Sequence, residues 1–189
     1  MLESVYSEFE VKNTSMKFLD DKTPATKVGC LGSLDEAMNQ KTITKKCEGV
    51  VTKTVTKGDG TGELKLTLHM RYDLYVKSYG MLSDGLKDGV YAYGQKSIHK
   101  PFCLTCDVFD EDGVQKLKAY PNCIVSSGIA RKIENGAEEV AEMELTLAVM
   151  PDEFGFGLYE ALVTDTLDEE VKTNWLTDFT PNLVKKIEA

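Results

Sequence analysis

Apolar and polar side chains alternate with a period of two along three stretches of this chain, a pattern typical of strands that bury one face. Residues 63–70 show the alternation most clearly, and residues 102–109 and 139–150 repeat it. The side chains expected to point inward are Leu64, Leu66, Leu68, Met70, Phe102, Leu104, Cys106, Val108, Ala141, Met143, Leu145, Leu147 and Val149. A fourth stretch, residues 42–57, is rich in Thr and Val, which strands favour.

Turn-forming residues separate these stretches. Three glycines between Gly58 and Gly62 predict a turn that links two strands, and Asp110–Gly113 predicts the turn of a later hairpin. Asn135–Gly136 is expected in a longer loop that precedes the strand at residues 139–150. Short strands joined by such turns favour antiparallel pairing.

Two stretches depart from the period of two. Residues 71–80 carry tyrosines at helical spacing and end in Gly80, which suits a helix C-terminus, so they predict one short helix with its tyrosines in the core. Residues 168–179 are a second helix candidate, with acidic side chains in the first turn and an apolar side. That apolar side comprises Val171, Trp175, Leu176 and Phe179. This candidate lies in a C-terminal tail, for which docking on another molecule stays open.

The fold class expected from these elements is mainly β: two packed antiparallel sheets, a sandwich or barrel, flanked by one short α-helix. The length of 189 residues suits a single domain over residues 1–189. Residues 1–13 form an N-terminal arm and residues 151–189 a C-terminal tail in this interpretation. The arm alternates Val5, Phe9 and Val11 with polar residues, which suits pairing with a neighbouring subunit or a frayed terminus.

Charge narrows the range of partners. The chain has 22 basic and 31 acidic side chains, a net charge of −9, and residues 107–170 alone carry −12. Such acidity argues against unspecific adhesion to nucleic acid and against docking on anionic lipid. No apolar run approaches the roughly 18 residues of a membrane span, and the N-terminus does not resemble a signal peptide. The acidic third is either a set of solvated loops and strand faces or one deliberately anionic surface.

The cysteines and histidines do not form a recognisable site. Cys103 and Cys106 form a CxxC within a predicted strand, where residues three apart point to opposite faces. The pair therefore cannot share a metal or close an easy disulfide, and we interpret both as buried structural thiols. Only His69 and His99 are available to complete a zinc site, so no metal is expected.

Catalytic and cofactor motifs are missing as well. The chain has no phosphate-binding glycine loop, no nucleophile elbow and no metalloprotease spacing. Paired carboxylates such as Glu138 and Glu139 arise by chance in so acidic a chain. We therefore expect no catalytic residues, no cofactor and no enzymatic activity.

The ordered set of motifs resembles the major tail tube protein of long-tailed, siphovirus-type phages and prophages of Gram-positive bacteria. The matching stretches run from about residue 26 to residue 184, and the most specific combines KAYPNC, SSG and RKIENGAEEVAE. The others are KVGCLGSLDEAMNQKTITKKCEGVV, GELKLTLHMRYDLYVKSYGM, GLKDGVYAYGQKS, CLTCDVFDEDG, ELTLAVMPDEFG and WLTDFTPNLV.

The resemblance implies a structural protein of the virion tail that assembles in the bacterial host cytoplasm. Six copies would join their sheets into a homohexameric ring, and rings would stack into a hollow tube. The implied partners are other copies of the chain, the tape-measure protein, and the tail tip, distal tail and tail terminator proteins. Double-stranded DNA would pass through the lumen during ejection as a cargo that does not adhere, and no membrane is involved.

Two groups of residues are candidates for roles in such a tube. Glu142 and Glu144 alternate on one face of a predicted strand, where they would line the lumen and repel DNA; the outer wall is the other possibility. The Thr- and Lys-rich region 42–62, with its glycine-rich tip, is expected to form a long hairpin that contacts the next ring. The tip residues in this interpretation are Lys57, Gly58, Asp59, Gly60, Thr61 and Gly62.

Two alternatives stay open. The chain could form the inner tube of a contractile injection system, such as a tail-like bacteriocin or a type VI system. It could also be a soluble enzyme or small-ligand β-barrel, which predicts a monomer with a well-formed apolar cavity.

Overall fold

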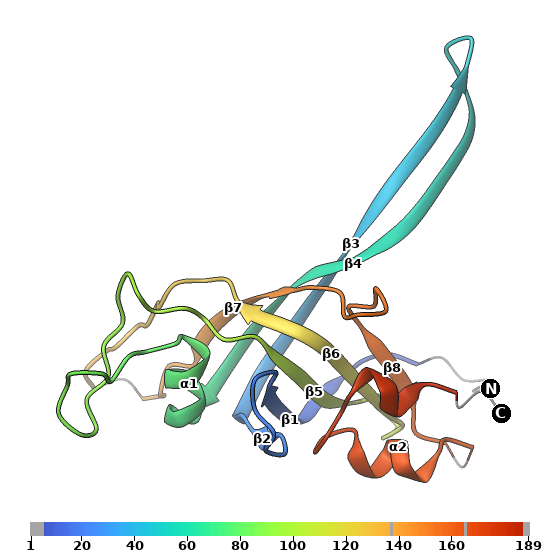
Figure 1. Cartoon of the computed structure of the whole chain (residues 1–189). Helices are drawn as coiled ribbons and strands as arrows, with labels where there is room; N and C mark the ends of the chain where they lie inside the picture. Colours follow the sequence, from blue (N-terminus) through green and yellow to red (C-terminus); the bar gives the residue numbers. More distant parts are fainter. Residues whose placement is uncertain (1–5, 137, 165, 187–189) are drawn as a thin grey trace.

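Eight β-strands dominate the computed structural model, which describes residues 6–136, 138–164 and 166–186 (Figure 1). The strands are β1 (Glu10–Phe18), β2 (Thr26–Lys27), β3 (Gly29–Cys47), β4 (Val50–Met70), β5 (Phe102–Phe109), β6 (Gln115–Val125), β7 (Met143–Val149) and β8 (Tyr159–Leu162). The helices are α1 (Tyr72–Ser78), α2 (Glu169–Asn174) and a final 3₁₀ turn, Pro181–Val184. The expectation of a mainly β, antiparallel fold with short helices is confirmed.

The strands form one hydrogen-bonded sheet in the order β2-β1-β5-β6-β7-β4-β3, and every pairing is antiparallel. Strand β6 is the branch point, because residues 116–119 pair with β8 whereas residues 123–125 pair with β7. The two layers that the sequence suggested are therefore continuous through β6 rather than separate sheets.

The two ends of this sheet meet at Val28. Strands β2 and β3 are separated only by this residue, so one extended segment pairs first with β1 and then with β4. The Val28 amide donates to the Thr14 carbonyl at 3.0 Å, and the Val28 carbonyl accepts from the Arg71 amide at 2.9 Å. Val28 itself is buried, and the sheet closes on itself around it as a flattened barrel.

Two hydrophobic cores lie on opposite faces of β5 and β6. The larger core fills the barrel, and its residues include Met16, Phe18, Leu64, Leu66, Leu68, Phe102, Leu104, Tyr120, Leu145, Leu147 and Val149. The smaller core lies on the outer face, where Cys103, Leu117 and Ala119 pack against Val171, Trp175 and Phe179. All residues of β5 before Phe109 are consequently buried, and those on the outer face include the polar residues Thr105 and Asp107.

Helix α1 packs on the larger core much as the tyrosine spacing predicts. Tyr75 and Tyr79 are buried, but Tyr72 is 61 % exposed, so the expectation of a fully buried tyrosine stripe is wrong at its first member. After the helix, the amide of Gly80 donates to the Lys77 carbonyl and that of Met81 to the Val76 carbonyl. This Schellman pattern needs the positive φ of +57° that Gly80 adopts.

The C-terminal tail packs on its own chain, which answers the question of where it docks. The Asp168 side chain caps α2 by accepting from the Glu170 amide at 2.8 Å. Trp175 is 1 % exposed and donates from its indole Nε1 to the Lys118 carbonyl at 3.1 Å. A buried indole with its donor satisfied fixes the tail to β6.

The N-terminal arm also pairs within the chain over its described part. The Phe9 amide donates to the Phe109 carbonyl at 2.8 Å, and Val11 lies opposite Val108 in the β1–β5 ladder. Val5 lies outside the described residues. Among the described helices, none has the length and apolar character to traverse a bilayer.

Candidate assembly surface

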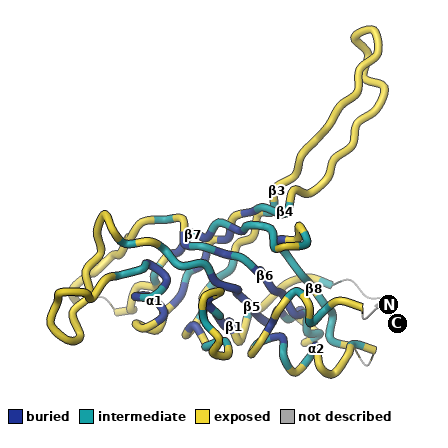
Figure 2. The backbone as a smooth tube through the Cα atoms, in the orientation of Figure 1, coloured by how far each residue is buried: buried dark blue, intermediate teal, exposed yellow. Residues whose placement is uncertain are grey.

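The β3–β4 hairpin stands clear of the barrel as a two-stranded ribbon (Figure 1). Every residue from Asn39 to Asp59 is exposed, and Figure 2 shows both arms exposed along their whole projecting length. From Gln40 to Cys47 the ribbon extends about 25 Å at the usual rise per residue. The sequence predicts a long hairpin in region 42–62 with its tip at Gly58–Gly62; the structure has a hairpin through this region with a different tip, and its role in contacting another ring stays a prediction.

The tip of this hairpin is Glu48–Gly49, so the turn predicted at Gly58–Gly62 is wrong. Cys47 and Val50 close the ladder, and both residues between them have positive φ, +49° for Glu48 and +82° for Gly49. Two positive φ angles make a type I′ turn, which matches the twist of the flanking strands. Glutamate before glycine is a weaker signal for this turn than asparagine or aspartate, and the three nearby glycines obscured it.

The glycine-rich segment forms the base of the hairpin within β4. Met38 pairs with Gly62 and Gln40 with Gly58, so residues 59–61 bulge opposite the single residue Asn39. The Asp59 carboxylate accepts from the Thr61 amide at 2.9 Å and shapes this bulge. A Cβ atom on Gly60, whose φ is +79°, would lie 2.7 Å from the Gly155 carbonyl oxygen. Glycine is needed here because the loop after β7 crosses close to β4.

The two faces of the hairpin differ in chemistry. One face carries threonine pairs, and the hydroxyls of Thr42 and Thr56 are 3.1 Å apart. On the other face Lys41 lies opposite Lys57 and Lys45 opposite Lys53, with the pair Ile43 and Val55 between them. We call this second face, comprising Lys41, Ile43, Lys45, Lys53, Val55 and Lys57, the lysine face.

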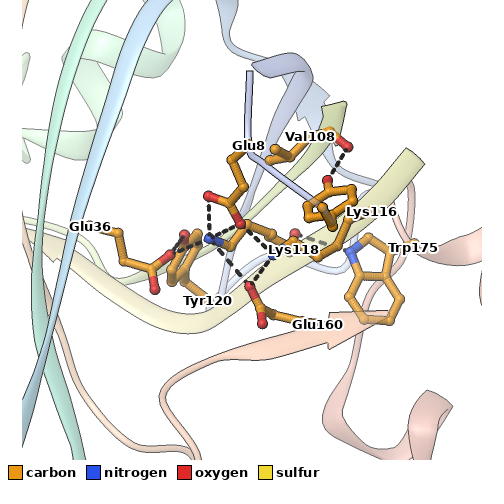
Figure 3. Close-up of polar contacts among 9 residues, drawn as sticks. Glu8, Glu36, Val108, Lys116, Lys118, Tyr120, Glu160 and Trp175 are labelled. Atoms are coloured by element: carbon orange, nitrogen blue, oxygen red, sulfur yellow. Dashed lines mark hydrogen bonds and ion pairs between the residues drawn. The ribbon is translucent and has the colours of Figure 1, made fainter. Parts of the chain in front are cut away.

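An ion cluster surrounds one buried lysine of β6, and the three glutamates that pair with this lysine are partly exposed (Figure 3). Lys118 of β6 is 3 % exposed, and its Nζ lies 2.7 Å from Glu36 Oε2, 3.2 Å from Glu8 Oε1 and 3.3 Å from Glu160 Oε1. Lys116 also pairs with Glu8 and Glu160. The cluster thus joins β6 to the N-terminal segment, to β3 near the hairpin base, and to β8.

The ion cluster shifts the pKa values of Glu8, Lys116 and Lys118 in the direction that keeps these three groups charged. Burial opposes the charge of Lys118, but the hydrogen bond and charge of Glu36, with those of Glu8, outweigh it and raise the Lys118 pKa. Burial also opposes the charge of Glu8, yet Lys116 and Lys118 lower the Glu8 pKa below its ordinary value. Burial raises the pKa of Tyr120, whose neutral hydroxyl donates to Glu36 at 2.5 Å.

The two acids singled out for the lumen, Glu142 and Glu144, lie on the same outer face of the sheet as predicted. Glu144 is on β7 opposite Thr67 of β4, and Glu142 directly precedes β7 with its carboxylate over Gly32 of β3. Both are exposed, whereas Leu145 and Leu147 of the same strand point into the core. Whether this face lines a lumen stays a prediction.

A second exposed surface lies at the end of β4 that is remote from the hairpin. The connection between β6 and β7 runs there beside α1, and we call its residues 131–136 and 138–142 the acidic loop (Figure 1). Ile133 is 87 % exposed and Val140 is 83 % exposed. The acidic loop, α1 and the end of β4 border an open cavity of about 620 Å³, into whose wall Arg131 stacks 4.1 Å from the Tyr75 ring centroid.

The cysteines divide into two groups. Cys103 packs in the smaller core while Cys106 lies opposite Lys118, so the CxxC pair points to opposite faces and is free, as predicted. Burial raises the pKa of both thiols to about 12. Cys30 and Cys47 are exposed and free, and Cys47 lies beside the hairpin tip.

The ion cluster is the feature that sequence reasoning missed. Lys116 and Lys118 alternate with Leu117 and Ala119, which looks like a strand with a solvated face. The apolar tail residues Val171, Trp175 and Phe179 offered one signal, because a helix that covers one face of β6 allows the other face to be interior.

The chain was compared with protein-family models, curated proteins and solved structures. No protein-family model and no curated protein matches this chain. Among solved structures, it is similar to one described as "Cryo-EM structure of the anti-feeding prophage cap (AFP tube terminating cap)". That likeness has a TM-score of 0.47 and 9 % sequence identity, and it covers 85 % of this chain and 97 % of that chain.

Proposed function

We propose that this chain is a structural subunit of a phage-type tail tube, in which hexameric rings stack into a hollow conduit for double-stranded DNA. The observation that carries the proposal is the β3–β4 hairpin, which projects from the barrel and is exposed from Asn39 to Asp59. A two-stranded ribbon is marginally stable alone in water, so a hairpin this long is expected to gain its order from a neighbouring copy. The sequence motifs that resemble tail tube proteins support the same role.

The free edges of the ribbon also favour assembly. Each arm of the hairpin presents a row of unpaired backbone groups, which proteins that remain monomeric normally shorten or cover. A projection that binds a different surface of the next copy makes head-to-tail contacts, and such contacts generate rings and stacks rather than closed pairs. Assembly of this type matches a tube better than it matches a dimer.

The outer face of β7 suits the wall of a DNA conduit. Glu142 and Glu144 are exposed there, and carboxylates facing the lumen would repel a polymer with about one charge per 1.7 Å of its axis. DNA would then slide without adhering, and the tape-measure protein would occupy the same space before ejection. Tail tip and terminator proteins would close the two ends of the tube in the virion tail.

The barrel interior supports a structural role over a ligand-binding one. Leu64, Leu104 and Leu147 are completely buried inside it. The described residues therefore occupy the space in which a small-ligand barrel would hold its ligand. We propose accordingly that the chain has no enzymatic activity.

Electron microscopy of the purified protein tests the proposal. We expect rings or tubes in negative stain, and we expect a variant in which Asn-Gly replaces residues 42–56 to stay folded but monomeric. The control variant Glu48→Asn keeps the full hairpin with a favoured Asn-Gly tip and should assemble like the wild type. Small monodisperse particles of the wild type at all concentrations, or tubes from the shortened variant, would contradict the proposal.

A further inference from the structure

We propose that the lysine face of the hairpin docks on the acidic loop of the next copy of this chain. The inference rests on the proposed function, since it names the surface that receives the hairpin when copies stack. Four observations support it: the separation of charge, the like-charged pairs on the hairpin, the matching apolar residues, and the positions of the two surfaces on the barrel.

The hairpin is a cationic projection on an anionic protein. Residues 39–58 contain five lysines and one glutamate, a net charge of +4, although the whole chain carries −9. The acidic loop carries the four acids Glu134, Glu138, Glu139 and Glu142 against the two bases Arg131 and Lys132, and Glu144 follows in β7. Surfaces of opposite sign on the same molecule attract between copies and steer their encounter.

The lysine pairs destabilise the isolated hairpin. Lys45 and Lys53 lie directly opposite each other, as do Lys41 and Lys57, and like charges in this position destabilise a strand pair. A carboxylate-rich partner removes this repulsion because it places counter-charges beside both lysines. The pattern thus fits a ribbon that becomes stable only when it is docked.

The lysine face and the acidic loop also both carry exposed apolar side chains. Ile43 and Val55 sit between the lysine pairs and are 50 % and 43 % exposed, and Ile133 and Val140 stand out from the acidic loop. Contact between these two sets would bury apolar surface in the middle, with the lysines and the acids Glu138 and Glu139 around it. An apolar centre inside a charged rim is the ordinary arrangement of a protein interface.

The positions of the two surfaces exclude their contact within one chain. The hairpin leaves the barrel where Gly62 pairs with Val149, whereas the acidic loop enters β7 where Met143 pairs with Leu68. These points are about 20 Å apart along β4, and the hairpin extends in the opposite direction. One copy's hairpin can therefore reach only another copy's acidic loop, in a head-to-tail series.

Paired charge reversal tests this docking. The variant Lys45→Glu/Lys53→Glu preserves the like-charged pair within the hairpin, so its fold should be retained, and circular dichroism checks that. We expect this variant, and separately Glu138→Lys/Glu139→Lys, to lower the assembled fraction in sedimentation at least tenfold, and the combination of all four changes to restore it. The matched control Glu111→Lys/Asp112→Lys reverses two adjacent exposed acids in the β5–β6 turn and should assemble normally.

A cross-link supplies an independent readout. The exposed Cys47 serves as a native handle in a Cys30→Ser background, and Val140→Cys supplies its partner, since the remaining cysteines are buried. A short bis-maleimide should then give a ladder of covalent oligomers from assembled protein, and none without the Val140→Cys change.

Two results would overturn the inference while the proposed function stands: wild-type tubes with unaltered assembly of Glu138→Lys/Glu139→Lys, or an equal loss of assembly in the β5–β6 control. Failure of the wild type to form rings or tubes would instead overturn the proposed function itself. The two failures are thus distinguishable in one set of samples.

Discussion

The two halves of β4 have similar backbones and opposite surroundings. From Gly62 to Met70 the strand lies between β3 and β7, and its leucines at 64, 66 and 68 are buried. From Val50 to Asp59 it has β3 on one side only, and every residue is exposed. Alternation is present in both halves, but only the inner half alternates between large apolar and charged residues. The strength of the alternation therefore distinguishes the half of β4 that covers the core from the half that is exposed on both faces.

The largest expected effect is on the free energy of unfolding, and it differs between substitutions in the two halves of β4. Leu66→Ala removes a fully packed side chain from the barrel and should lower the free energy of unfolding by about 4 kcal/mol. Val55→Ala on the same strand should change it by about 0.5 kcal/mol or less, because the side chain is already half exposed. Urea denaturation followed by circular dichroism measures both, and similar losses in the two variants would contradict the comparison.

The ion cluster should give the next largest effect. Lys118→Met keeps the buried stem but removes the cation that Glu36 shares with Glu8 and Glu160, and Lys116 still pairs with the last two, so the change should cost about 2 kcal/mol. Lys65→Met, which removes an exposed lysine from the inner half of β4, is the control and should cost under about 0.5 kcal/mol. Equal unfolding midpoints for the two variants would show that the cluster does not stabilise the barrel.

A smaller effect follows from the lowered pKa of Glu8. Burial works against the lowering, but the hydrogen bond from Lys116 and the charge of Lys118 produce it, so the folded protein binds the proton of Glu8 less readily than the unfolded chain does. The resulting stability is present above the ordinary pKa of 4.5 and is lost as the pH falls through the lower folded value. Thermal unfolding between pH 6 and pH 3 should show a shallower decline for Glu8→Gln than for the wild type.

The control for the pH measurement is Glu111→Gln, which removes an exposed carboxylate from the β5–β6 turn. Its decline should follow that of the wild type. A wild-type slope in Glu8→Gln would mean that Glu8 contributes nothing to the acid sensitivity of the fold.

The smallest effect concerns the hairpin alone. Lys53→Glu replaces a like-charged pair with an ion pair opposite Lys45 and should stabilise the local ladder by about 0.5 kcal/mol. Slower hydrogen exchange of amides in the outer half of β4 would report this gain, whereas global unfolding should barely change. Faster exchange would contradict the assigned register. Lys57→Glu, opposite Lys41, is the matched change nearer the base.

Much of the fold follows from local sequence, and the reasons are specific. Leu64, Leu66 and Leu68 mark one face of β4 and the strand at 143–149 shows the same contrast, whereas the strand at 102–109 is buried on both faces. The turn at Asp110–Gly113 forms as predicted, because the Asp110 carboxylate accepts from the Asp112 and Val114 amides. Helix α1 begins and ends within the range that its tyrosine spacing indicates.

Other features depend on contacts between residues far apart in the sequence, which local sequence patterns do not indicate. Glu8, Glu36 and Glu160 reach Lys118 from three separate parts of the chain, so no spacing rule connects them. The glycines at 58, 60 and 62 resemble a turn, yet the passing loop at Gly155 makes them a bulge. The sequence indicates the charge of the two surfaces that we propose for assembly. It does not indicate that they lie at opposite ends of the barrel, because that depends on where the fold places the hairpin and the acidic loop.

The closure at Val28 gives the barrel a mechanical property. Because one extended segment pairs with β4 along the hairpin base and then with β1, a pull on the hairpin passes through Val28 into the opposite side of the wall. The interstrand hydrogen bonds lie across the direction of that pull and are sheared together rather than opened one at a time. Tension applied at the hairpin is thus distributed over the strands on both sides of the barrel wall.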